Sequence, residues 1–255
     1  MSAQIDEEER AFRRLYGDWQ PMDPVAAKAF LEGYDRPWWV VGGHAIEAFT
    51  GRTRRHEDID LAFFRRDLAA FRRHVGDRLH VWSVGSGMLR PVNDDFPEPH
   101  PHAGQVWLRE HALAPWVLDG ILNDDRDGLW VSRRDPGHVA DLDDVTFVRD
   151  GVRYLNPEIV LQHKARLDRP KDRADLDAAW PLLDAGKRSL LTDSTQSTGA
   201  ETVVITLLYT TDPFYHICCA AISSRDLLAV PFSQCIDVER YRRKRRTQGE
   251  WSLRP

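Results

Sequence analysis

One continuous stretch, residues 37–64, constrains the fold more than any other part of this 255-residue chain. It begins with an apolar run at residues 38–41, breaks at Gly42 and Gly43, and resumes with apolar residues at helical spacing. This order predicts a strand, a tight turn and a helix. An arginine-rich loop then leads into residues 58–63, where acidic and apolar residues alternate with period two. That alternation predicts a strand with one acidic face.

The acidic face would carry Asp58 and Asp60, with Cα atoms about 6.5 to 7 Å apart, close enough to share a cation. Asp is depleted in strands, and neighbouring carboxylates repel each other unless a cation such as Mg²⁺ neutralises them. A strand face that contacts only solvent is the alternative. We favour a Mg²⁺ site, because the helix after Gly42 and Gly43 offers free backbone N–H groups to a phosphate. Phosphates and divalent cations bind together.

The order of these motifs resembles the polymerase-β-like nucleotidyltransferase superfamily, and most of all the bacterial aminoglycoside 2″-adenylyltransferases and their relatives. The resemblance is carried by Trp39, Val40, Gly42, Gly43, Ala45, Ile46, Gly51, Arg52, Thr53, Arg54, His56, Asp58 and Asp60. It implies an α/β (α+β) fold, a mixed twisted sheet with flanking helices. It also implies Mg²⁺ held by Asp58 and Asp60, and a nucleoside triphosphate, ATP by expectation, lying over the two glycines.

Two further residues of this stretch are expected to contact the nucleotide. The superfamily often has Ser after the glycines, whereas this chain has His44, so no hydroxyl contact to the terminal phosphate is implied. His44 still belongs to the expected nucleotide-binding set with Gly42 and Gly43. Arg54 lies in the loop between the glycines and the carboxylates, where we expect a phosphate contact. A basic loop that only contacts solvent is the alternative.

Asp119 interrupts an apolar stretch, residues 116–122, that otherwise has the pattern of a buried strand. An isolated buried carboxylate is costly, so a metal, a base role or a partner is the better explanation. The resemblance implies a third carboxylate on a later strand, serving as a metal ligand or as the base for the acceptor hydroxyl. Asp119 matches this position best, and Asp124, Asp125 and Asp127 are alternatives if the strand lies elsewhere.

Two patterns predict further strands. Residues 128–131 are expected to pair with the strand that carries Asp119. Asp150 and Gly151, between two apolar segments, predict a hairpin with a type I′ turn, because Asp-Gly tolerates the positive φ angles of that turn.

A helical hairpin is expected over residues 156–185. Asn156 provides a cap and Pro157 a first helical residue, which are typical helix-start signals. In the resembled family a lysine of the first helix is implied to face the nucleotide, and Lys164 occupies that position. An ordinary amphipathic hairpin with solvated charges is the alternative.

The composition changes after residue 188: Ser and Thr become frequent, and the three cysteines of the chain all lie beyond this point. We therefore expect a nucleotidyltransferase domain over residues 1–188 and a divergent tail over 189–255. The tail is either a small module or unrelated sequence that replaces natural C-terminal helices. It carries a basic stretch at 240–246.

Charge and composition exclude several classes of protein. The formal net charge of −5 argues against non-specific nucleic-acid binding. No apolar run approaches the roughly 18 residues of a membrane span, and the cysteines lack metal-ligand spacing. These features predict a cytoplasmic enzyme with no membrane partner.

The expected reaction is Mg²⁺-dependent transfer of a nucleoside monophosphate, AMP from ATP, to a hydroxyl of a small molecule such as an aminoglycoside, with release of pyrophosphate. This is an antibiotic-resistance activity. We expect five loop acids near Asp119 to suit a polycationic acceptor: Asp94, Asp95, Glu98, Asp124 and Asp125. The alternatives are a toxin-like nucleotidyltransferase acting on tRNA or protein, and a catalytically idle nucleotide-binding domain.

Overall fold

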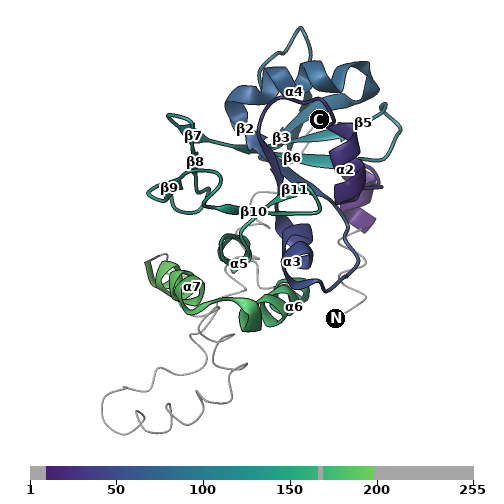
Figure 1. Cartoon of the computed structure of the whole chain (residues 1–255). Helices are drawn as coiled ribbons and strands as arrows, with labels where there is room; N and C mark the ends of the chain where they lie inside the picture. The colour runs from purple at the N-terminus through teal and green to yellow at the C-terminus, as the bar shows by residue number, and fades with distance from the viewer. Residues whose placement is uncertain (1–9, 166–168, 198–255) are drawn as a thin grey trace, which may run out of the picture. The chain divides into compact units, whose positions relative to one another are not determined.

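A computed structural model of the chain describes residues 10–165 and 169–197. In this part, eight strands form one sheet in the order β10-β11-β1-β2-β6-β5-β3-β4 (Figure 1). The strands are β1 (Trp38–Val40), β2 (Asp60–Phe64), β3 (His80–Gly85), β4 (Met88–Pro91), β5 (Gln105–Arg109), β6 (Leu118–Asn123), β10 (Thr146–Arg149) and β11 (Val152–Leu155). The sheet is mixed, because β1 runs parallel to β11 and β2 parallel to β6, whereas the other neighbours are antiparallel.

Helices flank this sheet. They are α2 (Pro24–Phe30), α3 (Gly42–Thr50), α4 (Leu68–Val75), α5 (Pro157–Lys164), α6 (Pro170–Ala179) and α7 (Ala185–Ser197), with 3-10 segments η1 (Arg65–Asp67), η2 (Gly76–Arg78) and η3 (Trp180–Leu182). In Figure 1, α4 lies on one side of the sheet, and α3, α5, α6 and α7 gather on the other. The expected mixed α/β sheet with flanking helices is confirmed.

The two faces of the sheet build two cores, because alternate strand residues point to opposite sides. On β2, Leu61 and Phe63 pack in a core with α2 and α4. Ala62 and Phe64 pack on the other face, in a core with α3, α5 and α6. Asp60 shares this second face through the same alternation. The acidic residue of the strand therefore points toward α3 and α5, and the apolar residues next to it stabilise both sides of the sheet.

A second, three-stranded sheet has the order β7-β8-β9, with β7 (Asp125–Arg126), β8 (Leu129–Val131) and β9 (Val139–Ala140). The prediction that residues 128–131 pair with the Asp119 strand is wrong. In the large sheet β6 is already hydrogen-bonded to β2 on one side and β5 on the other, so it has no free edge.

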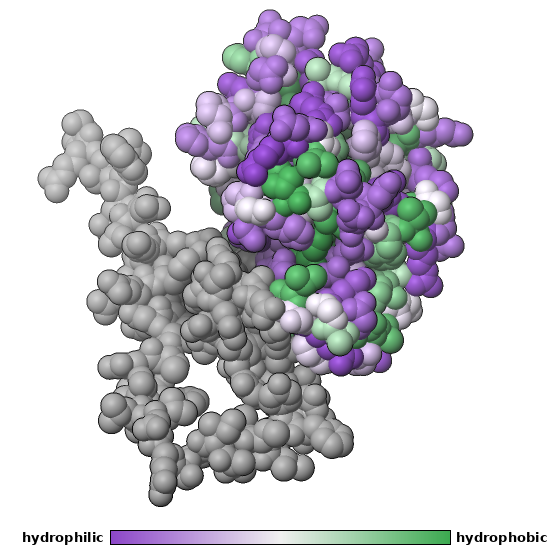
Figure 2. All heavy atoms as spheres, turned by 60° about the vertical axis from the view of Figure 1, so that its left-hand side comes forward, coloured by the Kyte–Doolittle hydropathy of each residue, from purple (hydrophilic) through white to green (hydrophobic). Residues whose placement is uncertain are grey.

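In Figure 2, the side of the molecule on which Figure 1 labels β7, β8 and β9 is largely hydrophilic, with separate hydrophobic patches.

Both predicted hairpins are present. Strands β10 and β11 pair across Asp150 and Gly151, whose φ angles of 54° and 71° fit the type I′ turn. Asn156 precedes α5, which begins at Pro157, and α6 follows as the second helix.

Helix α7 crosses residue 188, and most of the tail expected over residues 189–255 lies outside the described residues. The domain boundary therefore stays a prediction. None of the helices in the described ranges is both long enough and apolar enough to span a bilayer.

Candidate active site

The centre of the site is the pairing of β2 with β6. In their parallel register, Asp60 lies directly beside Asp119. Side chains of directly paired residues project from the same face of a sheet. Two carboxylates that are distant in the sequence therefore meet on the face that also carries α3 and α5. Asp119 lies in the strand expected for it, so the alternative positions Asp124, Asp125 and Asp127 are not needed.

Asp58 lies outside the regular strand, which begins at Asp60 rather than at residue 58 as expected. The chain between them is still tied to the sheet, because the Asp119 N–H donates to the Ile59 carbonyl at 3.0 Å. Asp58 is half-buried, and its negative charge acts on both Asp60 and Asp119. The three expected carboxylates are thus brought to one place.

The carboxylates raise one another's proton affinity. Burial, reinforced by the charge of Asp58, raises the pKa of Asp60 to about 6. Burial, reinforced by the charges of Asp60 and Asp58, raises the pKa of Asp119 well above its ordinary range. Asp119 is 7% exposed, and the indole N–H of Trp107, its partner on β5, partly offsets the rise in its pKa. Within the described residues, its Oδ1 atom accepts no hydrogen bond. A cluster of oxygen ligands with an unsatisfied buried oxygen fits a hard divalent cation such as Mg²⁺.

Gly42 and Gly43 allow the chain to approach this cluster closely. Gly42 has φ +67°, and a Cβ atom there would collide with the Asp60 carboxylate. A Cβ on Gly43 would collide with the Arg54 guanidinium and would lie 2.9 Å from the His56 ring. Gly42 is the first residue of α3, so the free N–H groups of that helix begin beside Asp60. Glycine is required at both positions.

Arg54 forms a structural ion pair. Its Nε and Nη2 atoms donate to the two carboxylate oxygens of Asp175 on α6, at 2.9 and 3.1 Å. The guanidinium therefore joins the loop before β2 to the helical hairpin, and it does not line the cleft described below. Its expected phosphate contact stays a prediction.

His44 stacks on His56, with ring centroids 3.7 Å apart, and His56 Nε2 lies 2.7 Å from Glu47 Oε2. The potential ligand atoms of these three residues lie within 4.8 Å of one another, a spacing that can hold a metal ion. In the arrangement observed, the hydrogen bond between His56 and Glu47 ties the loop before β2 to helix α3. This cluster could not be predicted from the sequence, because His44 and His56 approach each other only in the folded chain.

Lys164 is buried between two carboxylates of α6. Its Nζ atom lies 3.0 Å from Asp172 Oδ1 and 3.0 Å from Asp175 Oδ2. Arg169 also donates to Asp172, at 2.7 and 3.1 Å. The charge of Lys164 is therefore compensated within the protein, and its residue lines the cleft described below. Its expected contact with the nucleotide stays a prediction.

A cleft of about 410 Å³ lies over this face of the sheet. It runs from Gly42 and Asp60 across β2 and β6 to β5, and residues of α5 and of the segment after β8 close its other side. Three polar residues that line the cleft were not predicted from the sequence: Arg133, Arg134 and His163. Arg133 and Arg134 form an adjacent basic pair, but that pattern alone does not reveal which cleft it enters.

Residues 25–85 match the family model for aminoglycoside-2″-adenylyltransferase. The expected resemblance is thereby confirmed for the segment that holds Gly42, Gly43, Asp58 and Asp60. Asp119 and Lys164 lie outside the matched residues, so their assignment depends on the geometry given above.

Curated relatives are similar over a limited length. A 2″-aminoglycoside nucleotidyltransferase of Escherichia coli is 30% identical over 95 residues, which is 34% of this chain and 53% of the relative. One of Klebsiella pneumoniae gives the same values. The chain thus spans about half the length of the curated relatives it matches.

Solved structures of such enzymes are also similar. A solution structure of the antibiotic-resistance factor ANT(2″)-Ia has 20% identity and a TM-score of 0.44, over 68% of this chain and 88% of that one. ANT(2″)-Ia in complex with adenylyl-2″-tobramycin has 18% identity and a TM-score of 0.44, over 66% and 92%. The lincosamide adenylyltransferase LnuA, with lincomycin bound, has 16% identity and a TM-score of 0.46, over 65% and 99%.

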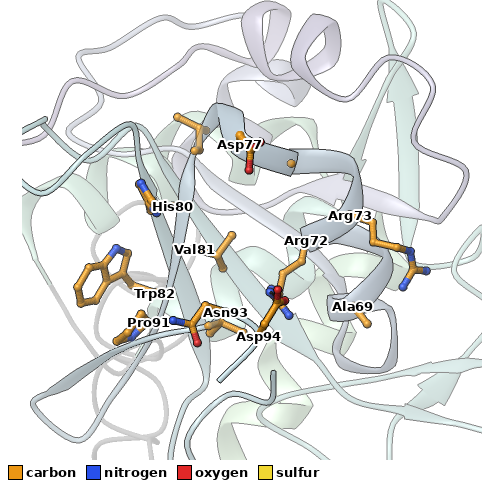
Figure 3. A pocket seen from close by; sticks show the side chains of 13 residues that line it. Ala69, Arg72, Arg73, Asp77, His80, Val81, Trp82, Pro91, Asn93 and Asp94 are labelled. Atoms are coloured by element: carbon orange, nitrogen blue, oxygen red, sulfur yellow. Dashed lines mark hydrogen bonds and ion pairs between the residues drawn. The ribbon is translucent and has the colours of Figure 1, made fainter. Parts of the chain in front are cut away.

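The loop acids expected to attract a polycationic acceptor are largely engaged with arginines. Asp124 pairs with Arg65 at 2.8 Å, and Asp125 pairs with Arg66. Asp94 pairs with Arg72 at 3.1 Å in a separate hollow between α4 and strands β3 and β4 (Figure 3). That hollow adjoins α4, which packs on the face opposite Asp60. Three of the five acids are therefore compensated by arginines, whereas Asp95 and Glu98 are exposed.

Proposed function

We propose that this chain is a Mg²⁺-dependent nucleotidyltransferase that moves a nucleoside monophosphate, AMP from ATP, to a hydroxyl of a small antibiotic of the aminoglycoside class. The observation that carries the proposal is the register of β2 and β6, which puts Asp60 beside Asp119 next to the N-terminus of α3. The similarity to 2″-aminoglycoside nucleotidyltransferases supports the choice of reaction and acceptor. The domain that does this is proposed to span residues 1–188, with the rest of α7 completing its core.

Each residue of the cluster has a role in this proposal. Asp58, Asp60 and Asp119 would hold the divalent cation, which neutralises phosphate charge when bound. The free N–H groups of α3 at Gly42, Gly43 and His44 would donate to the phosphate oxygens nearest Asp60.

Asp119, whose pKa is raised by burial, takes the proton of the acceptor hydroxyl. The acceptor oxygen then forms a bond to the α-phosphorus, the bond from that phosphorus to the bridging oxygen breaks, and pyrophosphate leaves with the electron pair. Most of the rate enhancement comes from positioning and charge neutralisation.

The first test is thermal unfolding of the protein with Mg²⁺ and each of the four ribonucleoside triphosphates. A ligand at about 100 times its dissociation constant stabilises by roughly 2.7 kcal/mol, which raises the midpoint by about 5 to 10 °C. We expect the largest rise with ATP, and no rise for Asp60→Asn. Asp77→Asn is the matched control, because Asp77 is exposed and adjoins the hollow beside α4.

The second test identifies the acceptor. Wild type is incubated with Mg²⁺, α-labelled ATP and, separately, tobramycin, lincomycin, tRNA or total protein. Label on tobramycin, lost in Asp60→Asn and kept in Asp77→Asn, is the expected result. Label on tRNA or protein alone would replace the acceptor class proposed here. Transfer that survives in Asp60→Asn would refute the assignment of the carboxylates.

A further inference from the structure

Arg133 is a cation of the cleft that the reaction described above does not use. It follows β8 of the small sheet, yet it lines the cleft over the large sheet together with Gln105 of β5 and Asn123 of β6. The guanidinium lies close to Gly104, immediately before β5. A Cβ atom added to this glycine would be only 2.9 Å from Arg133 Nη2. The guanidinium therefore lies over the β5–β6 side of the cleft, on the face that carries Asp119.

Three other cations of the cleft have partners within the protein. Lys164 pairs with Asp172 and Asp175, Arg169 pairs with Asp172, and Arg134 donates to the His163 carbonyl oxygen at 3.4 Å. In the part of the chain that the structure describes, Arg133 has no ion pair and no hydrogen bond. Although the residue as a whole is exposed, loss of water around its guanidinium lowers the pKa of Arg133, and the negative charge of Asp119 acts in the opposite direction. Asp119 attracts Arg133 without forming an ion pair with it, so an anionic ligand would supply the direct partner that this cation lacks.

The chemistry of the cleft indicates which anion this is. A guanidinium presents N–H donors in a fork that matches the oxygens of a phosphate. The cleft is continuous from Gly42 and Asp60 to Arg133. A nucleotide whose α-phosphate lies at the carboxylates thus has a cation within the same cleft for the rest of its phosphate chain.

We propose that Arg133 binds the β- and γ-phosphates of the donor nucleotide and stabilises pyrophosphate as the leaving group. This proposal rests on the proposed nucleotidyl transfer. When the bond from the α-phosphorus to the bridging oxygen breaks, the electron pair goes to the pyrophosphate oxygen. The N–H groups of Arg133 hydrogen-bond to the departing group while its charge increases. Arg133 keeps its own proton throughout.

The test is a series of calorimetric titrations of the full chain, in Mg²⁺, with AMP, ADP, ATP and inorganic pyrophosphate. For Arg133→Ala we expect the affinity for ATP and pyrophosphate to fall about 10- to 100-fold, as for loss of a charge-assisted bidentate contact. The affinity for AMP should change less than about twofold. Arg133→Lys should lose less than Arg133→Ala for ATP, because it keeps the charge without the fork.

Arg73→Ala is the matched control. Arg73 is also an exposed arginine for which the described residues supply no ion pair, but it lies on α4 beside the other hollow (Figure 3). The Arg73→Ala variant should bind all four ligands with the same affinity as wild type. Thermal unfolding of each variant without ligand shows whether the fold is retained.

Three results would overturn the proposal. Equal ATP affinity of Arg133→Ala and wild type would show that Arg133 does not contact the phosphates. An equal loss for AMP and ATP in a folded variant would show a general effect on the cleft. If wild type binds none of the four ligands, the proposed function fails as well. If wild type binds ATP and transfers AMP, only the role of Arg133 is in question.

Discussion

At the scale of single residues, Asp60 and Asp119 repel each other when both are ionised and no cation lies between them. Each strand is held by hydrogen bonds to its neighbours, so the carboxylates cannot move apart. The protein without metal therefore stores unfavourable electrostatic energy at the place where the reaction is proposed to occur.

Replacing Asp60 by Asn should stabilise the metal-free protein. The pKa of Asp60 in the folded chain, about 6, lies above its ordinary value of 3.8, so the folded chain binds this proton more tightly than the unfolded chain does. In wild type, the stabilising effect of the protonated Asp60 is complete below about pH 4, and it is lost as the pH rises through 6. In EDTA at pH 7.5 we expect Asp60→Asn to unfold at a higher urea concentration than wild type. Its free energy of unfolding should be higher by roughly 2 to 3 kcal/mol.

With Mg²⁺ present, wild type should gain stability and Asp60→Asn should not. A metal-free Asp60→Asn protein that is less stable than wild type at pH 7.5 would contradict the electrostatic explanation.

His163 should make stability depend on pH in the opposite sense to Asp60. Burial, together with the charges of Arg134 and Arg133, lowers the pKa of His163 to about 4, from an ordinary 6.5. Below pH 6.5 the unfolded chain therefore binds a proton that the folded chain does not, and stability falls as the pH decreases toward 4. The loss should reach about 2 to 3 kcal/mol.

Urea unfolding of His163→Gln between pH 4 and 7 measures this loss as a difference from wild type. His80→Gln, at an exposed position, is the control. Parallel pH curves for His163→Gln and wild type would rule out the effect.

The sequence predicted only part of the site, and the reason is physical. Gly42, Gly43, Asp58 and Asp60 could be proposed because turn chemistry and strand alternation are local patterns, although Asp58 lies just before the strand. Arg133 was missed because whether an arginine is paired depends on residues distant in the sequence.

At the scale of elements, the helical hairpin is attached to the site by buried charges. Asp175 of α6 accepts from Arg54, in the loop before β2, and pairs with Lys164 of α5. Asp172 pairs with Lys164 as well, and hydrogen bonds from Arg169 and Lys164 outweigh the opposing effect of burial and lower the pKa of Asp172. The network joins two helices and a loop, and Lys171 of α6 adds an ion pair to Glu57 of the same loop at 2.7 Å.

Removing one carboxylate of this network should be costly. Asp175→Asn leaves Arg54 without its carboxylate and Lys164 with only one, so we expect a loss of about 3 kcal/mol in urea unfolding at pH 7. The control Asp143→Asn breaks an ion pair with Arg153 in which the Asp143 side chain is 84% exposed, and should cost less than about 1 kcal/mol. Similar losses for the two variants would show that the network does not stabilise the hairpin.

Local chemistry also explains which elements were predictable. The β10–β11 hairpin was expected from Asp150 and Gly151, and α5 from Asn156 and Pro157, since turns and helix starts depend on adjacent residues. The partner of β8 was wrongly predicted, because strand pairing depends on which edges the rest of the sheet leaves free. Likewise, three of the five acids expected to attract an acceptor have arginine partners that a local pattern does not reveal.

At the scale of the whole molecule, α7 decides where the folded domain ends. Leu191 is 1% exposed in the core that also contains α3 and α5, and Gln162 of α5 donates to the Leu190 carbonyl at 3.3 Å. A boundary at residue 188 would remove this leucine from the core.

A chain that ends at residue 188 should therefore be less stable than one that ends at residue 197. Loss of a buried leucine costs about 2 to 3 kcal/mol. Urea unfolding of both chains and of the full-length protein measures the difference. Equal midpoints for the two shortened chains would place the end of the domain at residue 188, as the change in composition indicated.

The parallel pairing of β2 and β6 also has a consequence for how the protein folds. The two strands are separated by α4 and strands β3 to β5, so their pairing closes a long loop, and contacts of this kind limit folding rates. A nascent or partly refolded chain carries Asp60 and Asp119 but not the pair they form. The carboxylate pair comes into existence only with the central sheet, so metal affinity regained during refolding is a kinetic probe of that step.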